Sequence, residues 1–248
     1  MIEFTNKTIV VTGATSGIGK ATAQHLATHN AHLVLVARDG QKLELLKDSL
    51  PFSNRHFCLP CDLLCDAHRL FELLAALIDV PVDGAVHSAG MRILEPLQIG
   101  TDKTWEDTYF LNTIAAMHLI KAIKKYNKKA SSSIVLIASI AGIVGNPAIS
   151  AYCASKGALI AAARAWALEM AQHNIRINTV SPGYLQSEML QNHKKMMTAQ
   201  SYNKIVMQHP LGLGTPDDVA HAVLFFLSQG SRWITGANLV VDGGYCAQ

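Results

Sequence analysis

Short, almost entirely apolar segments alternate along the chain with longer amphipathic ones. The apolar segments have the length and the Val and Ile content of β-strands, and they cover residues 7–12, 31–37, 55–59, 83–88, 132–139, 174–180 and 237–242. The amphipathic segments predict helices over residues 17–29, 40–50, 66–79, 102–127, 150–173 and 216–229. Strands that are apolar on both faces indicate a sheet that is covered on both sides.

Residues suited to capping a helix precede three of these segments. Asp66, Thr101 and Thr215 are the expected caps. The alternation of strands and helices predicts an α/β fold, a Rossmann-type doubly wound parallel seven-stranded sheet. No linker divides residues 1–248, so we expect a single domain, with a long irregular stretch at about 184–209 acting as a substrate lid.

The composition favours a compact protein, because 50% of the residues are hydrophobic and 16% are charged. The net charge is +3 with the two signs interspersed, which argues against nucleic acid as a partner. Arg164 and Glu169 interrupt the longest apolar stretch, so no membrane span is expected. The first residues lack the pattern of a secretion signal, and we therefore expect a cytoplasmic protein.

Three cysteines lie close together in the sequence, at Cys58, Cys61 and Cys65, with His56 and His68 on either side. A zinc ribbon or finger needs a second ligand pair at a defined spacing, and none follows. We expect free thiols and no metal site here, with a redox role as a less favoured alternative.

Three glycines fall between the first predicted strand and its helix, in the sequence VTGATSGIG. Gly13, Gly17 and Gly19 would permit a tight turn and let backbone N–H groups approach a pyrophosphate at the start of the helix. A plain turn needs one glycine rather than three. The stretch therefore favours dinucleotide binding, although its spacing differs from the commoner G-x-G-x-x-G.

The end of the second strand distinguishes between two forms of the cofactor. NAD sites usually carry an acid there for the ribose 2′-OH, whereas an Arg accommodates the 2′-phosphate of NADP. Here Arg38 directly follows the last strand residue, Ala37, and Asp39 comes next. The sequence favours NADP(H), with NAD(H) as the alternative if Arg38 is only a solvated loop charge.

Tyr152 and Lys156 are separated by one helical turn in the sequence AYCASK. On a helix they share a face, so their polar ends can converge on one point. A nearby cation favours the phenolate form of a tyrosine, so the pair suits proton transfer. Because a Tyr and a Lys four residues apart also occur by chance, the spacing alone does not show that the pair is functional, and the other motifs of the chain are needed.

Several motifs agree in order and spacing with one family. They are TGATSGIG, HSAG at 87–90, Asn112 in a helix, Ser139 at a strand end, YCASK, and SPG at 181–183. Over its whole length the chain resembles the short-chain dehydrogenase/reductases. The resemblance implies an oxidoreductase that interconverts a ketone and a secondary alcohol with a nicotinamide cofactor.

The resemblance assigns a role to each of four residues. Tyr152 would exchange a proton with the substrate oxygen, and Lys156 would lower the pKa of Tyr152 and bind the nicotinamide ribose. Ser139 would orient the carbonyl. Asn112 would hold a water that relays protons to Lys156.

The resemblance also implies the cofactor-binding set. Asp62 would accept a hydrogen bond from the adenine amino group, and Ser187 would meet the nicotinamide carboxamide. The full set is Gly13, Ser16, Gly17, Ile18, Gly19, Arg38, Asp62, Leu63, Ala89, Gly90, Tyr152, Lys156, Pro182, Gly183 and Ser187. Two departures bear on cofactor affinity: HSAG replaces the usual NNAG, and Ser16 stands where NADP(H) users often have a basic residue.

The substrate is less well defined. The run from His209 to Tyr245 is most similar to 3-oxoacyl-(acyl-carrier-protein) reductases, which implies reduction of a 3-oxoacyl thioester. Methionines of the lid suit an acyl chain or else pack within lid helices; they are Met189, Met196, Met197 and Met207. The alternatives are a dehydrogenase of a sugar, polyol or hydroxysteroid, and a non-catalytic dinucleotide sensor.

Two kinds of protein partner are expected. Lysines gather in KAIKKYNKKA, at Lys121, Lys124, Lys125, Lys128 and Lys129. By resemblance they would dock an acidic acyl carrier protein; alternatively, they form a solvated helix end whose dipole favours cations. The Ala-rich helices at 102–127 and 150–173 imply, again by resemblance, a homodimer or homotetramer.

Overall fold

Seven parallel strands form one sheet in the computed structural model, which describes residues 3–127, 131–194 and 198–248. The strands are β1 (Thr8–Thr12), β2 (His32–Ala37), β3 (Phe57–Pro60), β4 (Gly84–His87), β5 (Ser132–Ile137), β6 (Ile175–Pro182) and β7 (Asn238–Val241). Their order across the sheet is β3-β2-β1-β4-β5-β6-β7, and every neighbouring pair is parallel. The expected doubly wound sheet is confirmed.

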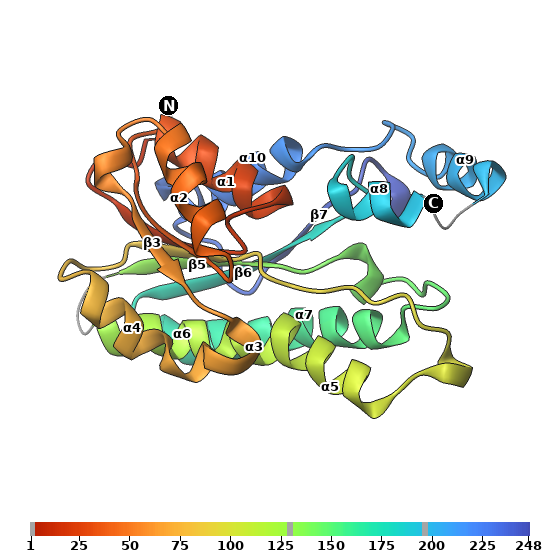
Figure 1. Ribbon diagram of the computed structural model, residues 1–248, viewed down its shortest axis with the longest axis horizontal. Helices are drawn as coiled ribbons and strands as arrows, with labels where there is room; N and C mark the ends of the chain where they lie inside the picture. The colour runs from red at the N-terminus through yellow and green to blue at the C-terminus, as the bar shows by residue number, and fades with distance from the viewer. Residues whose placement is uncertain (1–2, 128–130, 195–197) are drawn as a thin grey trace.

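Helices cover both faces of the sheet (Figure 1). One layer consists of α1 (Gly17–Thr28), α2 (Gly40–Ser49) and α10 (Pro216–Leu227). The other consists of α3 (Leu63–Asp66), α4 (Leu70–Leu77), α5 (Asp102–Tyr109), α6 (Ala115–Tyr126) and α7 (Ser150–Ala171). This arrangement accounts for strands that are apolar on both faces.

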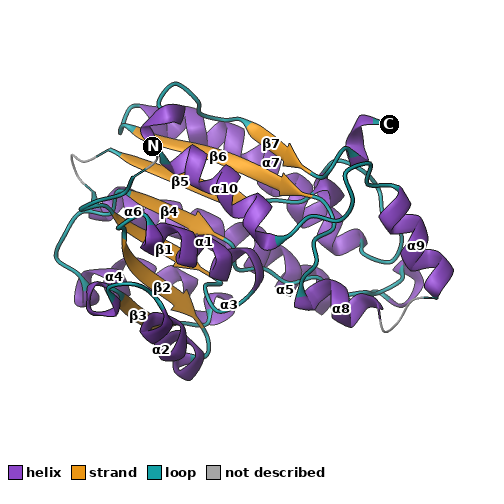
Figure 2. Cartoon of the chain, turned by 90° about the horizontal axis from the view of Figure 1, so that it is seen from above, coloured by secondary structure: helices purple, strands orange, loops and turns teal. Residues whose placement is uncertain are grey.

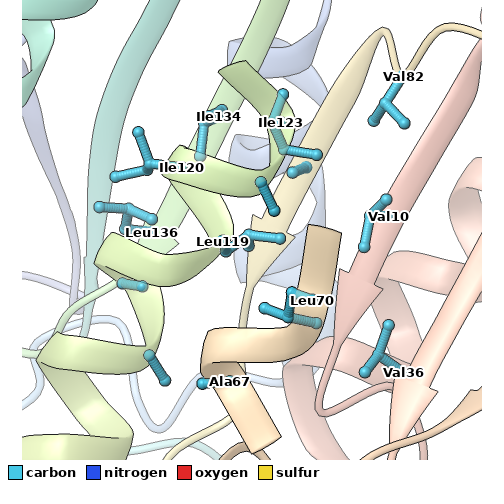
Figure 3. Close-up of a cluster of buried hydrophobic side chains, with 14 of the residues drawn as sticks. Val10, Val36, Ala67, Leu70, Val82, Leu119, Ile120, Ile123, Ile134 and Leu136 are labelled. Atoms are coloured by element: carbon cyan, nitrogen blue, oxygen red, sulfur yellow. The ribbon is translucent and has the colours of Figure 1, made fainter. Parts of the chain in front are cut away.

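Alternate residues of the strands belong to different halves of the core. Val10 of β1 packs in the cluster that includes Leu70 of α4 and Leu119 of α6 (Figure 3). Its neighbours Ile9 and Val11 pack in the cluster on the opposite face, beneath α1, α2 and α10. Successive side chains of a strand point to opposite faces, so an uninterrupted apolar strand supplies both clusters.

The helix expected over 102–127 is divided at Phe110–Ile114, where the backbone is π-helical. Such π-bulges occur frequently at functional sites. This one contains Asn112, whose side chain is fully buried. The prediction of one continuous helix over 102–127 did not anticipate the bulge, whose buried residues are Asn112 and Thr113.

The helix expected over 66–79 is also divided, and its cap differs from the prediction. Asp62 caps α3 by accepting a hydrogen bond from the Leu64 N–H at 3.0 Å, whereas the Asp66 side chain makes no capping bond. The prediction for Asp66 was wrong because the chain turns into a helix as soon as it leaves β3. Thr101 and Thr215 cap α5 and α10 as expected.

The expected lid contains α8 (Glu188–Lys194) and α9 (Ala199–Met207), which lie beyond the carboxyl ends of the strands (Figure 2). Met207 is 82% exposed. The described part of the chain contains no helix that is both long and apolar enough to cross a membrane. Several residues with predicted roles lie outside the described part: Lys128, Lys129, Met196, Met197 and the side chain of Met189.

Candidate active site

A cleft of ≈ 730 Å³ crosses the carboxyl ends of the central strands. It includes the point between β1 and β4 where the strand order reverses, which is where open α/β sheets bind ligands. Of the predicted site residues, all except Gly19 and Asn112 line this cleft. Both exceptions are buried behind its wall.

The glycine loop forms one part of the wall. Gly13 has φ +65°, and a Cβ there would lie 2.7 Å from the Ala89 nitrogen. A Cβ on Gly19 would lie 2.2 Å from the Gly13 carbonyl oxygen. These close approaches leave room for no other residue, and they hold the first turn of α1 open to the cleft. The loop therefore fits a pyrophosphate at the start of a helix.

His87 and Thr12 brace the loop from behind. The Thr12 hydroxyl accepts hydrogen bonds from the backbone N–H groups of Ser88 and Ala89, both at 3.2 Å, and contacts His87 Nδ1 at 3.1 Å. His87 Nε2 lies 3.2 Å from the Leu111 carbonyl oxygen. Burial, with a smaller effect from Lys156, lowers the pKa of His87 to about 3. A neutral imidazole thus connects β1, β4 and the π-bulge where the family usually has an amide.

Charged residues mark the end of the cleft beside β2 and β3. Arg38 is exposed at the end of β2, and Lys42 lines the same region. The Asp39 carboxylate caps α2 by accepting from the Lys42 N–H at 3.1 Å. Asp39 and Arg38 both line the cleft, and Lys42 Nζ lies 3.7 Å from the second Asp39 oxygen, so a cation stands on either side of this carboxylate.

Asn112 fixes the chain at the opposite end of the cleft. Its Oδ1 accepts from the Met91 N–H at 2.9 Å, and its Nδ2 donates to the Met91 carbonyl at 3.0 Å and to Ser155 Oγ at 2.9 Å. A Cβ on Gly90 would lie 2.8 Å from Asn112 Oδ1 and 3.6 Å from Lys156 Nζ. Gly90 therefore lies between the Asn112 amide and the Lys156 amine, and the space between them is too small for any side chain at position 90.

Tyr152, Ser139 and Lys156 meet at this end, where α7 passes beneath the end of β5. Tyr152 and Ser139 are half-buried and face the cleft, and Lys156 is buried. Lys156 Nζ donates to the Ile137 carbonyl at 2.7 Å and lies 5.8 Å from the centre of the Tyr152 ring. Of the small residues between them, Ser155 is buried and its hydroxyl donates to the Tyr152 carbonyl at 2.8 Å.

Burial affects the protonation of both groups. It raises the pKa of Tyr152, whereas a hydrogen bond from Ser139 and the charge of Arg92 lower it. Burial lowers the pKa of Lys156 to about 7. Lys156 is not among the groups that shift the pKa of Tyr152 in the protein alone, so its predicted lowering of that pKa stays a prediction.

Comparisons with known proteins agree with this geometry. A family model described as enoyl-(acyl carrier protein) reductase matches residues 13–246. A 3-oxoacyl-(acyl-carrier-protein) reductase of Rickettsia typhi is 34% identical over 247 residues, covering 98% of each chain. A crystal structure of a short-chain type dehydrogenase/reductase from Mycobacterium marinum covers 100% of this chain and 98% of its own, with a TM-score of 0.88 at 25% identity.

The chain belongs to the short-chain dehydrogenase/reductase family. It is accordingly an oxidoreductase. Another relative within the family, the 2,3-dihydro-2,3-dihydroxybenzoate dehydrogenase of Bacillus subtilis, is 34% identical and covers 96% of this chain and 95% of its own. Relatives of equal identity thus have different substrates in their names.

Some residues of this short-chain dehydrogenase/reductase face the cleft without having been predicted. Arg92, Asn146, Tyr184 and Tyr245 line it near Tyr152, and Asn146 Nδ2 donates to the Tyr184 hydroxyl at 2.7 Å. Only Arg92 carries a signal in the sequence, as a charge two residues after the HSAG motif. The others reach the cleft by tertiary packing alone.

Of the cysteine cluster, only Cys61 lines the cleft, beside Asp62. Burial raises the pKa of Cys58 and of Cys61 to about 11, which disfavours a reactive thiolate. Across residues 3–127, 131–194 and 198–248, no three His, Cys, Asp or Glu side chains gather as metal ligands.

Lys156→Met is expected to stabilise the cofactor-free protein by about 2 kcal/mol at pH 6, as measured by denaturant unfolding. The folded-state pKa of about 7 lies below the usual 10.5, so burying the charge destabilises the fold in full below pH 7, and this effect fades as the pH approaches 10.5. The gain should therefore shrink at pH 9. Lys121→Met, at an exposed site on α6, is the control. A less stable Lys156→Met variant at pH 6 would contradict the assignment of Lys156 as a destabilising buried charge.

Proposed function

We propose that the protein is an NADP(H)-dependent oxidoreductase that interconverts a ketone and a secondary alcohol. One observation carries the proposal: the half-buried Tyr152 lines the same cleft as Ser139 and the buried Lys156, and the wall of that cleft includes a glycine loop suited to a pyrophosphate.

The side chains at this end suit general acid and base chemistry. A bound nicotinamide supplies or accepts the hydride. The Tyr152 hydroxyl gives its proton to the substrate oxygen in reduction and takes it back in oxidation, while Ser139 holds that oxygen in place. Lys156, with a pKa of about 7, changes its protonation readily near neutral pH. Asn112 positions the Gly90 and Met91 backbone against it; its role in a water relay stays a prediction.

The preference for NADP(H) is supported by the charges beside β2. Arg38 and Lys42 line the cleft there, and both suit a phosphate. The carboxylate of Asp39 is engaged as the cap of α2. Arg38 is accordingly proposed to bind the 2′-phosphate.

The first candidate substrate is a 3-oxoacyl thioester. It is supported by the names of several relatives, including the reductase of Rickettsia typhi. The second candidate is a smaller alcohol or ketone, supported by Arg92 and Tyr184 near Tyr152 and by relatives named as alcohol, glycerol and 2,3-dihydro-2,3-dihydroxybenzoate dehydrogenases.

A panel of carbonyls and alcohols with NADPH, NADH and their oxidised forms tests the proposed function. Oxidation of NADPH by at least one ketone, faster than oxidation of NADH, is the expected result. Turnover of no carbonyl and no alcohol with any cofactor form would contradict the proposal and favour a dinucleotide sensor.

Docking of a carrier protein by the lysine cluster finds limited support. Lys124 and Lys125 lie at the end of α6 that leads into β5, away from the lid (Figure 1). Lys125 also contacts Glu72 at 3.7 Å and the Phe71 ring at 3.7 Å. This placement at the far end of the sheet favours a solvated helix end over a docking site.

Lys124→Glu combined with Lys125→Glu is therefore expected to change kcat/KM for a carrier-bound 3-oxoacyl substrate by less than about twofold at low salt. Arg55→Glu combined with Lys103→Glu makes the same charge change elsewhere and serves as the control. A loss specific to the carrier-bound substrate that shrinks as salt rises would support docking instead, because steering by surface charges is screened.

A homodimer or homotetramer is supported by apolar side chains left on the surface of α7 and after α10. Leu168 is 78% exposed and Trp233 is 95% exposed. Such residues are typical of a surface that a second copy covers, and light scattering reports the mass directly.

A further inference from the structure

Arg92 lies beside the reacting end of the cleft. The residue before it, Met91, is held to the Asn112 side chain through both its N–H and its carbonyl, at 2.9 and 3.0 Å. Asn112 in turn holds Ser155, one residue before Lys156. The backbone from which the Arg92 side chain extends is therefore fixed relative to the catalytic lysine.

The chain after Arg92 is also anchored. The Glu95 N–H donates to the Ala148 carbonyl at 2.7 Å. The Glu95 carboxylate accepts from the Thr101 N–H and from the Thr104 hydroxyl, both at 3.2 Å. Glu95, the acid nearest to Arg92 in the sequence, thus already accepts hydrogen bonds at the start of α5. Residues 92–94 connect two anchored residues, Met91 and Glu95.

The guanidinium of Arg92 carries a charge that the described part of the protein does not neutralise. No ion pair and no side-chain hydrogen bond joins it to any described residue. It is half-buried and lines the cleft together with Ser139 and Tyr152. Glu188 lines the same cleft from the exposed surface of α8. A half-buried guanidinium with no protein partner keeps its hydrogen-bond donors free for an anion that enters the cleft.

The position of Arg92 separates it from the cofactor phosphates. Those groups are expected at the glycine loop and at Arg38, whereas Arg92 follows the Gly90 and Met91 segment that borders Lys156. Its charge also acts on the Tyr152 hydroxyl, whose pKa it lowers. An anion bound by Arg92 would therefore lie close to the atom that reacts.

We propose that Arg92 binds a carboxylate of the substrate, so that the protein acts on ketones and secondary alcohols that carry an acid group a few bonds from the reacting carbon. The planar guanidinium matches a carboxylate with two parallel hydrogen bonds, and such pairs fix orientation as well as affinity. The carboxylate would place the carbonyl against Ser139 and Tyr152 and reject neutral analogues. This inference rests on the proposed ketone and alcohol chemistry at Tyr152. It names the substrate class, and it favours the second candidate, a small ketone or alcohol, over the 3-oxoacyl thioester, which has no carboxylate near its ketone.

Paired substrates that differ only in charge test the inference. With NADPH, the wild-type protein is expected to reduce 3-oxocyclohexanecarboxylate with a kcat/KM about tenfold or more above that for its methyl ester. Arg92→Gln should lower the value for the acid about 30-fold, whereas the ester should lose less than about threefold, through the weaker field at Tyr152. Arg92→Lys, which keeps the charge but not the fork, should recover part of the loss.

Equal losses for the acid and the ester in Arg92→Gln would overturn the inference, since they would indicate a structural role. A wild type that reduces the two equally well would overturn it too, while leaving the ketone reductase function intact. A wild type that reduces no ketone at all would instead count against the proposed function.

Binding gives an independent measurement that needs no turnover. Calorimetry on the Tyr152→Phe protein with NADP⁺ should detect binding of cyclohexanecarboxylate and weaker or no binding of cyclohexanecarboxamide. Adding Arg92→Gln should abolish the difference between the two ligands. Equal binding of acid and amide to the Tyr152→Phe protein would exclude a carboxylate site at Arg92.

Discussion

Tyr152→Phe is expected to lower kcat about 1,000-fold or more, because the change removes only the hydroxyl that exchanges a proton with the substrate oxygen. The rest of the cleft stays intact, since the aromatic ring keeps its place on α7. NADP(H) should therefore bind the variant with nearly the wild-type Kd. Steady-state kinetics and a fluorescence titration with NADPH measure the two effects separately.

Tyr109→Phe, at an exposed position on α5, is the matched control for that experiment. It should retain wild-type turnover. Substantial activity in Tyr152→Phe, within tenfold of the control, would show that another group carries the proton.

Arg38→Asp is expected to lower the ratio of kcat/KM for NADPH to that for NADH by about 100-fold. The change removes the proposed partner of the 2′-phosphate and adds an acceptor for the ribose 2′-OH. Asp39 caps α2 through one of its oxygens, and the new carboxylate would stand beside it at the strand end with no cap to make. Kinetics with both cofactors at a fixed ketone concentration measure the ratio.

Arg55→Asp makes the same charge change outside the cleft and should leave the ratio unaltered. A wild type that already prefers NADH would refute the assignment of Arg38. An unchanged ratio in Arg38→Asp would move the phosphate site to Lys42 or Ser16.

The fold could be predicted from the sequence because the strands are buried on both faces. Each strand therefore appears in the sequence as a continuous apolar run. The two ends of every predicted strand lie within two residues of the observed ends. The helix limits set by Thr215 and Thr101 were also predictable, since a local hydrogen bond defines each of them.

What the sequence did not reveal depends on contacts between distant segments. The π-bulge at Phe110–Ile114 accompanies the hydrogen bonds of Asn112 to Met91 and Ser155, which no local pattern encodes. The pKa values of Tyr152 and Lys156 depend on burial that a helical spacing does not report. The sequence shows that Arg92 is charged, but it does not show that this side chain lines the cleft.

The buried lysine shows how the site differs from the core around it. The buried Lys156 amine is removed from water, and it makes a single hydrogen bond, to the Ile137 carbonyl. A well-packed apolar residue would stabilise this position better. Its presence is consistent with a selection for chemistry rather than for stability.

Transfer of deuterium from cofactor to substrate tests the central claim most directly. With NADPH that carries deuterium at both C4 positions and a ketone that the panel identifies, mass spectrometry and NMR of the product should show one deuterium on the carbinol carbon. The Tyr152→Phe protein should form almost none of this product. A product without deuterium, or equal labelling by the Tyr152→Phe protein, would contradict the account of a hydride-transferring enzyme with Tyr152 as its proton donor.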